Sequence, residues 1–160
     1  MKILVVYYSF SGTTRRVAEA LAKELGADLA EIRCERYRMG PLGFIKAAYD
    51  SWADRLPAIA APQNPPAAYD LVVVGGPMWA MRVATPVRAY LRQEAGRFAR
   101  IAFLMTLGGA PSDKALGEME ALARRAPEAA LVLSDQDLKA GKLAASVQGF
   151  AAGLRARQAA

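Results

Sequence analysis

Four short runs of apolar residues constrain what this chain can fold into more than any other feature. They cover residues 3–8, 71–74, 101–105 and 129–133, and each is nearly continuous in apolar side chains rather than alternating. A strand with this pattern is buried on both faces, which is typical of a parallel sheet covered by helices. A fifth and weaker run, residues 28–33, mixes polar and apolar side chains, as an edge strand would.

Segments with helical spacing lie between these predicted strands. Val17, Leu21 and Leu25 share one face of a helix that Gly26 would end as a C-cap. Further helices are predicted to begin at an N-cap followed by proline (Thr85-Pro86), to follow a Ser112 cap, and to cover residues 143–154. This alternation predicts an α/β fold, a three-layer sandwich with a five-stranded parallel sheet, in one domain over residues 1–160.

Residues 36–66 interrupt the alternation. The segment contains five prolines, and within it Phe44, Ala47, Ala48 and Trp52 suggest a helix. Two interpretations stay open: a helix on the sheet followed by a proline-rich return loop, or a flap over a binding site.

The turn after the first predicted strand carries the most specific motif. It runs Ser9-Phe10-Ser11-Gly12-Thr13-Thr14 and leads into a helix. Free backbone N–H groups at a helix N-terminus favour an anion such as phosphate, hydroxyl side chains can add hydrogen bonds, and glycine permits close approach. The turn lacks both Gly-Lys-Ser/Thr and Gly-x-Gly-x-x-Gly, which disfavours a P-loop and a dinucleotide site. A simple hydroxyl cap on the helix is the alternative.

Residues 1–25, which contain this turn, resemble the opening of the flavodoxin family, whose first loop holds the phosphate of FMN. A second segment, Gly75-Gly76-Pro77-Met78-Trp79-Ala80-Met81-Arg82, is similar to the Gly-x-Pro-x-Trp loop of one branch of that family, at the end of the third predicted strand. The resemblance implies a sheet in the order 2-1-3-4-5, with FMN at the carboxyl ends of its central strands.

The same resemblance assigns FMN contacts to three loops. The first would hold the phosphate with Ser9, Ser11, Gly12, Thr13 and Thr14, with Phe10 beside them. The second would contribute Pro77, Met78, Trp79, Ala80, Met81 and Arg82, and the third Thr106, Leu107, Gly108 and Gly109. The Trp79 indole would stack on the isoalloxazine ring, although a core tryptophan is the alternative. Arg82 would place a cation near the flavin and raise the potential of the second electron step, unless it is a solvated surface arginine.

Composition excludes several classes of chemistry. The chain has no histidine and one cysteine, Cys34, which rules out histidine-based triads, histidine-ligated metals and internal disulfides. Cys34 is expected to be a small buried hydrophobe, and Asp135 and Asp137 to lie in a solvated loop rather than a metal site. No long apolar stretch or cleavage-type N-terminus is present, so we expect no membrane partner and a cytoplasmic location.

The charge distribution bears on the partner. The formal net charge is +6, but the basic residues are scattered without interleaved aromatics, so we expect no nucleic-acid partner. Typical flavodoxins are acidic, so either the redox partner of this basic chain is acidic, or the chain is not an electron shuttle of that kind.

The resemblance implies an FMN-binding protein that passes one or two electrons to a redox partner protein or a small acceptor, without a catalytic side chain. An FMN-dependent NAD(P)H:quinone-type reductase is the first alternative, with Arg82, Arg88 or residues 36–66 holding the second substrate. A flavin-free interaction module with the same fold is the second alternative.

Overall fold

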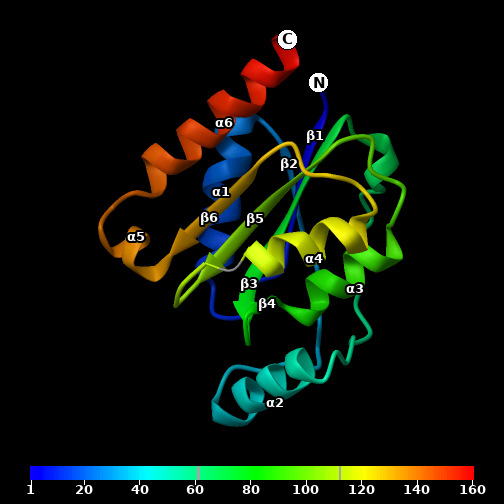
Figure 1. The fold of residues 1–160 in the computed structure, drawn as a ribbon, viewed down its shortest axis with the longest axis vertical. Helices are drawn as coiled ribbons and strands as arrows, with labels where there is room; N and C mark the ends of the chain where they lie inside the picture. The colour runs from blue at the N-terminus through cyan, green and yellow to red at the C-terminus, as the bar shows by residue number, and fades with distance from the viewer. Residues whose placement is uncertain (61, 112) are drawn as a thin grey trace.

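A parallel sheet forms the centre of the computed structural model, which describes residues 1–60, 62–111 and 113–160 (Figure 1). Its parallel strands are β1 (Ile3–Tyr7), β2 (Asp28–Glu31), β3 (Leu71–Trp79), β5 (Ile101–Leu107) and β6 (Ala130–Ser134). They lie in the order β2-β1-β3-β5-β6, which confirms the predicted class and strand order. The direction of strand succession therefore reverses between β1 and β3, where ligands bind in open α/β sheets.

The third predicted strand is longer than its apolar run. Residues 75–82 are predicted to form a loop, but β3 continues to Trp79 and pairs with a sixth, antiparallel strand, β4 (Arg82–Val83). A Cβ at Gly75 would lie 2.3 Å from the Leu104 carbonyl oxygen, and one at Gly76 would lie 2.5 Å from a Val87 methyl. The two glycines therefore let β3 pass close to its neighbours, and they do not end the strand.

Helices cover both faces of the sheet. They are α1 (Thr13–Leu25), α2 (Pro41–Trp52), α3 (Thr85–Gln93), α4 (Asp113–Ala123), α5 (Asp135–Lys139) and α6 (Leu143–Ala159), with a 3₁₀ turn at Pro66–Ala68. One face of the sheet packs against α1 and α6, the other against α3 and α4. The predicted three-layer sandwich is confirmed. Among the described residues, no helix is both long and apolar enough to cross a membrane.

Of the predicted helix caps, the one at Gly26 is confirmed and the one at Thr85 is wrong. Gly26 ends α1 in the left-handed conformation, at φ 63°, as predicted. Thr85 is the first residue of α3 rather than its cap, which is Ala84, and Ser112 lies outside the described residues. The solvated loop predicted at residues 135–137 is wrong, because Ser134 and Asp137 form a capping box that starts the short helix α5.

Helix α2 confirms that residues 36–66 contain a helix, but it does not lie on the sheet. Figure 1 shows it beyond the arrowheads of the central strands, apart from the helices that cover the two faces. Only Ala47, Asp50 and Ser51 of this helix are buried, whereas Phe44 and Trp52 are exposed.

Candidate functional site

The carboxyl ends of β1, β3 and β5 bring the three predicted loops together. The Thr14 and Thr106 hydroxyl oxygens lie 2.7 Å apart in a buried hydrogen bond that joins the first loop to the third. The Trp79 ring lies 5.6 Å from the Tyr8 ring and 5.7 Å from the Phe10 ring, which joins the first loop to the second. The convergence expected from the strand order is therefore present.

The turn at residues 9–14 is organised by one hydroxyl group. The Ser9 Oγ accepts the backbone N–H groups of Gly12, at 3.1 Å, and of Arg15, at 3.2 Å. Gly12 is the N-cap residue of α1, at φ 99°, and provides no side chain to bond the first turn. The N–H groups of Thr13 and Thr14 have no hydrogen-bond partner among the described residues. The turn therefore leaves donors free at the positive end of the helix.

A hollow of about 440 Å³ lies beside the first of these residues, Thr13. It is lined by Ser11, Gly12, Thr13, Arg16, Asp135, Leu138 and Lys139. Arg16 and Lys139 bring two cations, and Asp135 brings one carboxylate. Sequence reasoning missed Lys139, because α5 was not predicted. Arg15 is not part of the hollow, since it pairs with Glu31 at 2.6 Å.

Trp79 is enclosed by aromatic rings. Only 8% of it is exposed, and the rings of Tyr8, Phe10 and Tyr37 meet it nearly edge to face at 5.1–5.7 Å. Stacking of a flavin ring on the Trp79 indole would therefore require Phe10 or Tyr37 to move aside. The stacking role of Trp79 stays a prediction.

The third loop is open around its glycines. A Cβ at Gly109 would meet no atom within 4 Å, and one at Gly108 would lie 3.3 Å from the Asp135 carboxylate. Together with Leu107 these residues line a second hollow, of about 560 Å³. The loop thus lies beside α5, and its assignment to the flavin edge also stays a prediction.

The hairpin turn between β3 and β4 is strained. Trp79 pairs with Arg82, and the two residues between them, Ala80 and Met81, have φ values of 48° and 67°. Positive φ at both central positions is the geometry of a type I′ turn, which favours Asn and Gly. Side chains with a Cβ are disfavoured there by about 1–2 kcal/mol per residue.

Replacing Met81 with glycine should therefore stabilise the protein. We expect Met81→Gly to raise the unfolding free energy by about 0.5–1 kcal/mol, a rise in Tm of about 2 °C for a chain of this size, measured by thermal denaturation. Met39→Gly is the matched control, because Met39 is also exposed but does not have a positive φ. An equal Tm change in both variants would contradict the strain argument.

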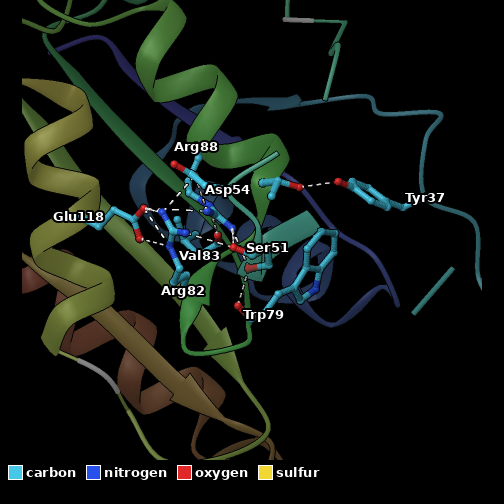
Figure 2. A network of polar contacts seen from close by, with 9 residues as sticks. Tyr37, Ser51, Asp54, Trp79, Arg82, Val83, Arg88 and Glu118 are labelled. Atoms are coloured by element: carbon cyan, nitrogen blue, oxygen red, sulfur yellow. Dashed lines mark hydrogen bonds and ion pairs between the residues drawn. The ribbon is translucent and has the colours of Figure 1, made fainter. Parts of the chain in front are cut away.

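Two arginines behind this turn form a charge-balanced network (Figure 2). Arg82 pairs with Glu118, with Nε 2.9 Å from Oε2, and with Asp54 at 3.1 Å. Arg88 is 1% exposed and donates to the Val83 carbonyl at 2.9 Å, to the Ser51 hydroxyl at 2.7 Å and to Asp54 at 2.9 Å. Two guanidinium groups thus face two carboxylates.

This pairing bears on the two arginine roles expected from the sequence. The bonds to Glu118 raise the pKa of Arg82, and burial lowers the pKa of Arg88. Arg82 is mostly buried, and the carboxylates of Asp54 and Glu118 offset its positive charge. This pairing reduces the electrostatic effect that Arg82 can have on the potential of a nearby flavin, and the effect itself stays a prediction. Arg88 is enclosed and cannot reach a second substrate.

A second polar cluster fixes the start of the segment that contains α2. The buried Asp50 carboxylate accepts from the Arg36 guanidinium at 2.6 and 3.1 Å and from the Tyr37 hydroxyl at 2.9 Å. The Tyr37 oxygen also lies 2.7 Å from the Thr85 hydroxyl on α3. The Arg36 guanidinium holds the pKa of Asp50 below its usual value, and burial raises the pKa of Tyr37 to about 12.

Cys34 shows no sign of activation. It is partly buried, its Sγ lies 3.8 Å from the Ala58 carbonyl oxygen, and burial raises the pKa of its thiol. A raised thiol pKa lowers the thiolate fraction, in agreement with the expected packing role.

Fold and site together define a doubly wound α/β protein with a hydroxyl-rich turn at its topological switch point. A family model described as flavodoxin matches residues 2–145, and the chain belongs to the flavodoxin family. A comparison with curated proteins finds no match.

Solved structures share the fold. A flavoprotein in complex with FMN from Lactobacillus acidophilus NCFM superposes with a TM-score of 0.69 at 24% identity, over 89% of this chain and 97% of that one. A protein of Bacteroides uniformis ATCC 8492 that is described as a candidate flavoprotein gives a TM-score of 0.73 at 19% identity, over 92% of this chain and 96% of that one. An apo NADH:FMN oxidoreductase gives 0.52 at 13% identity, over 92% and 88%.

Proposed function

We propose that this chain is a cytoplasmic, single-domain FMN protein that passes one or two electrons to a redox partner protein or a small acceptor. The observation that carries the proposal is the free N–H group of Thr13 at the start of α1, beside a hollow that Thr13 lines together with two cations. When bound, FMN supplies the redox chemistry, and the chain supplies binding and electrostatics.

The residues of the hollow fit a phosphate group. The free amide of Thr13 can donate to its oxygens, and the hydroxyls of Ser11 and Thr13, 3.3 Å apart, can turn to do the same. Arg16 and Lys139 offset the phosphate charge. The Asp135 carboxylate lies in the same hollow and opposes an anion, so the phosphate is expected on the α1 side, away from α5.

Among the described residues, no preformed pocket for the isoalloxazine ring matches the hollow at the phosphate position. Phe10 or Tyr37 must move to expose the Trp79 indole, and the Gly108–Gly109 loop offers open backbone on the other side. The flavoprotein from Lactobacillus acidophilus NCFM, which shares the fold at 24% identity, was solved in complex with FMN, and this supports FMN as the ligand.

The absorption spectrum of the purified protein tests the proposal. After addition of FMN and removal of the excess by gel filtration, we expect retained flavin bands and quenched flavin fluorescence. A protein that retains no flavin at micromolar FMN would instead be the flavin-free interaction module.

Rapid mixing with NADPH separates a carrier from a reductase. We expect slow or no bleaching of the bound flavin, because the burial of Arg88 removes one of the contacts proposed for a second substrate. Bleaching within milliseconds would favour the NAD(P)H:quinone-type reductase.

A further inference from the structure

Helix α2 has an inverted distribution of polarity. Its buried residues are Ala47, Asp50 and Ser51, a single methyl group and two polar side chains. Residues at spacings of three, four and three face outward, and their exposed fractions are 83% for Leu42, 64% for Ile45, 50% for Tyr49 and 75% for Trp52. A surface helix of a globular protein normally turns its apolar stripe to the core. The outward stripe of α2 is therefore built for an apolar environment outside the chain.

The polar contacts of α2 hold the helix in this orientation. Its buried side is fixed by Arg36 and Tyr37 on Asp50, and by the Ser51 hydroxyl, which donates to the Trp79 carbonyl at 2.7 Å. Figure 2 shows Ser51 between Trp79 and Arg88. The apolar stripe is exposed because the helix is bonded on its opposite side, and a rotation that buried it would break these bonds.

The stripe belongs to a larger surface. Of the nine large hydrophobic residues exposed in the described part of the chain, seven lie on α2, just before it or on the β3–β4 turn, and we call them the α2 apolar surface: Met39, Leu42, Phe44, Ile45, Tyr49, Trp52 and Met81. Met81 belongs to it because it lines one hollow with Trp52, next to the β3–β4 turn. Exposed apolar residues gathered on one part of a protein mark interaction sites.

Basic residues border this surface. The side chains of Arg38, Lys46 and Arg55 have no ion-pair partner among the described residues, and Arg55 lies 5.3 Å from the centre of the Tyr49 ring. The one acidic residue of α2, Asp50, is buried and paired. Two exposed carboxylates lie nearby: Glu35 beside Arg36, and Asp54, which is paired with Arg82 and Arg88. The free charges at the margin are predominantly positive.

We propose that the α2 apolar surface docks on an anionic lipid surface. The exposed side chains would enter the boundary between headgroups and acyl chains, while Arg38, Lys46 and Arg55 contact lipid phosphates. Leu, Phe and Trp on one side of a helix with Lys and Arg beside them are the residues such interfacial helices use. The proposal departs from the expectation of no membrane partner, because that expectation came from a search for spanning segments and could not detect an exposed face of a folded helix.

Two other occupants fit less well. A second copy of the chain in a two-fold dimer would bring the same cationic margin against itself, in a chain of net charge +6. A protein partner would need a groove complementary to these exposed side chains, which belong to a helix at the end of the molecule (Figure 1). Lipid accepts protruding side chains without a complementary shape.

Vesicle binding tests the proposal, with the protein both as purified and loaded with FMN, so that its outcome is independent of the flavin. We expect co-sedimentation with phosphatidylcholine vesicles that contain about one third phosphatidylglycerol, and weak binding to phosphatidylcholine alone. The double variant Ile45→Ser/Trp52→Ser should lose binding at least about tenfold, and Lys46→Glu should lose several-fold. Trp52 fluorescence should shift to the blue on binding.

The controls change residues of similar type at exposed positions away from α2. Leu29→Ser removes an exposed apolar residue on the edge strand β2, and Lys23→Glu reverses an exposed charge on α1; both should bind like the unmodified chain. Binding that the α2 variants leave unchanged, or no sedimentation with anionic vesicles, would overturn the proposal. So would a dimer in sedimentation equilibrium that only Ile45→Ser/Trp52→Ser dissociates, because the surface would then be a subunit interface.

Discussion

The variant Thr13→Asp should lose FMN affinity by at least about 100-fold, or about 2.7 kcal/mol, while it folds normally. Thr13 is the first residue of α1 and lines the hollow that we assign to the phosphate. An aspartate there places a carboxylate against the phosphate dianion in the hollow, and repulsion between them weakens binding. Because a carboxylate at a helix N-terminus favours the helix, the unfolding free energy should not fall.

Riboflavin provides the matched ligand for this test, since it has the same ring and no phosphate. Titrations followed by flavin fluorescence should show equal riboflavin affinity in the unmodified chain and in Thr13→Asp. The neutral isostere Thr13→Asn should lose FMN affinity only a few-fold. Equal losses for FMN and riboflavin, or no loss for FMN, would place the phosphate elsewhere.

Arg88→Met should lower the free energy of unfolding by about 3 kcal/mol, the largest loss of stability expected among the variants proposed here. Methionine occupies much of the space of the arginine stem, but it leaves the Val83 carbonyl without its donor and Asp54 and Glu118 opposite a single guanidinium. Removing one partner of a buried charged network costs about 3–5 kcal/mol, whereas replacing all partners by apolar groups can cost little. Urea denaturation measures the change.

A control and a local measurement accompany this prediction. Arg92→Met lies on the same helix α3 at an exposed position and should change stability by less than about 0.5 kcal/mol. Because Arg88 bonds Ser51, limited proteolysis of Arg88→Met should cleave faster within residues 36–60. Stability equal to that of Arg92→Met would show that the network contributes little to folding.

The strands and the switch point could be predicted from the sequence because their signals are local. Continuous apolar runs mark strands buried on both faces, and the hydroxyl-rich turn follows β1 directly. Gly75 and Gly76 suggested that the third strand ends in a loop, which is wrong. Their role is to let β3 lie close to Leu104 and Val87, which are distant in sequence. The short strand β4 has too few residues for any periodic pattern.

Long-range partners explain what could not be predicted. The apolar spacing on α2 is the same pattern that marks a core face elsewhere, and only the tertiary contacts of Asp50 and Ser51 show that this stripe points outward. Arg88 is of a residue type that is rarely buried, and its partners Ser51 and Asp54 come from a segment more than thirty residues away. Neither feature has a local signature.

The polar attachment of α2 also sets how that segment responds to denaturant and temperature. Detaching the helix exposes mainly hydrogen-bonding groups, because its apolar side chains are already in contact with solvent. The slope of an opening free energy with urea, and its heat-capacity change, scale with the surface newly exposed, apolar surface above all for the heat capacity. Native-state hydrogen exchange should therefore show α2 opening with little dependence on urea, as a unit separate from the sheet.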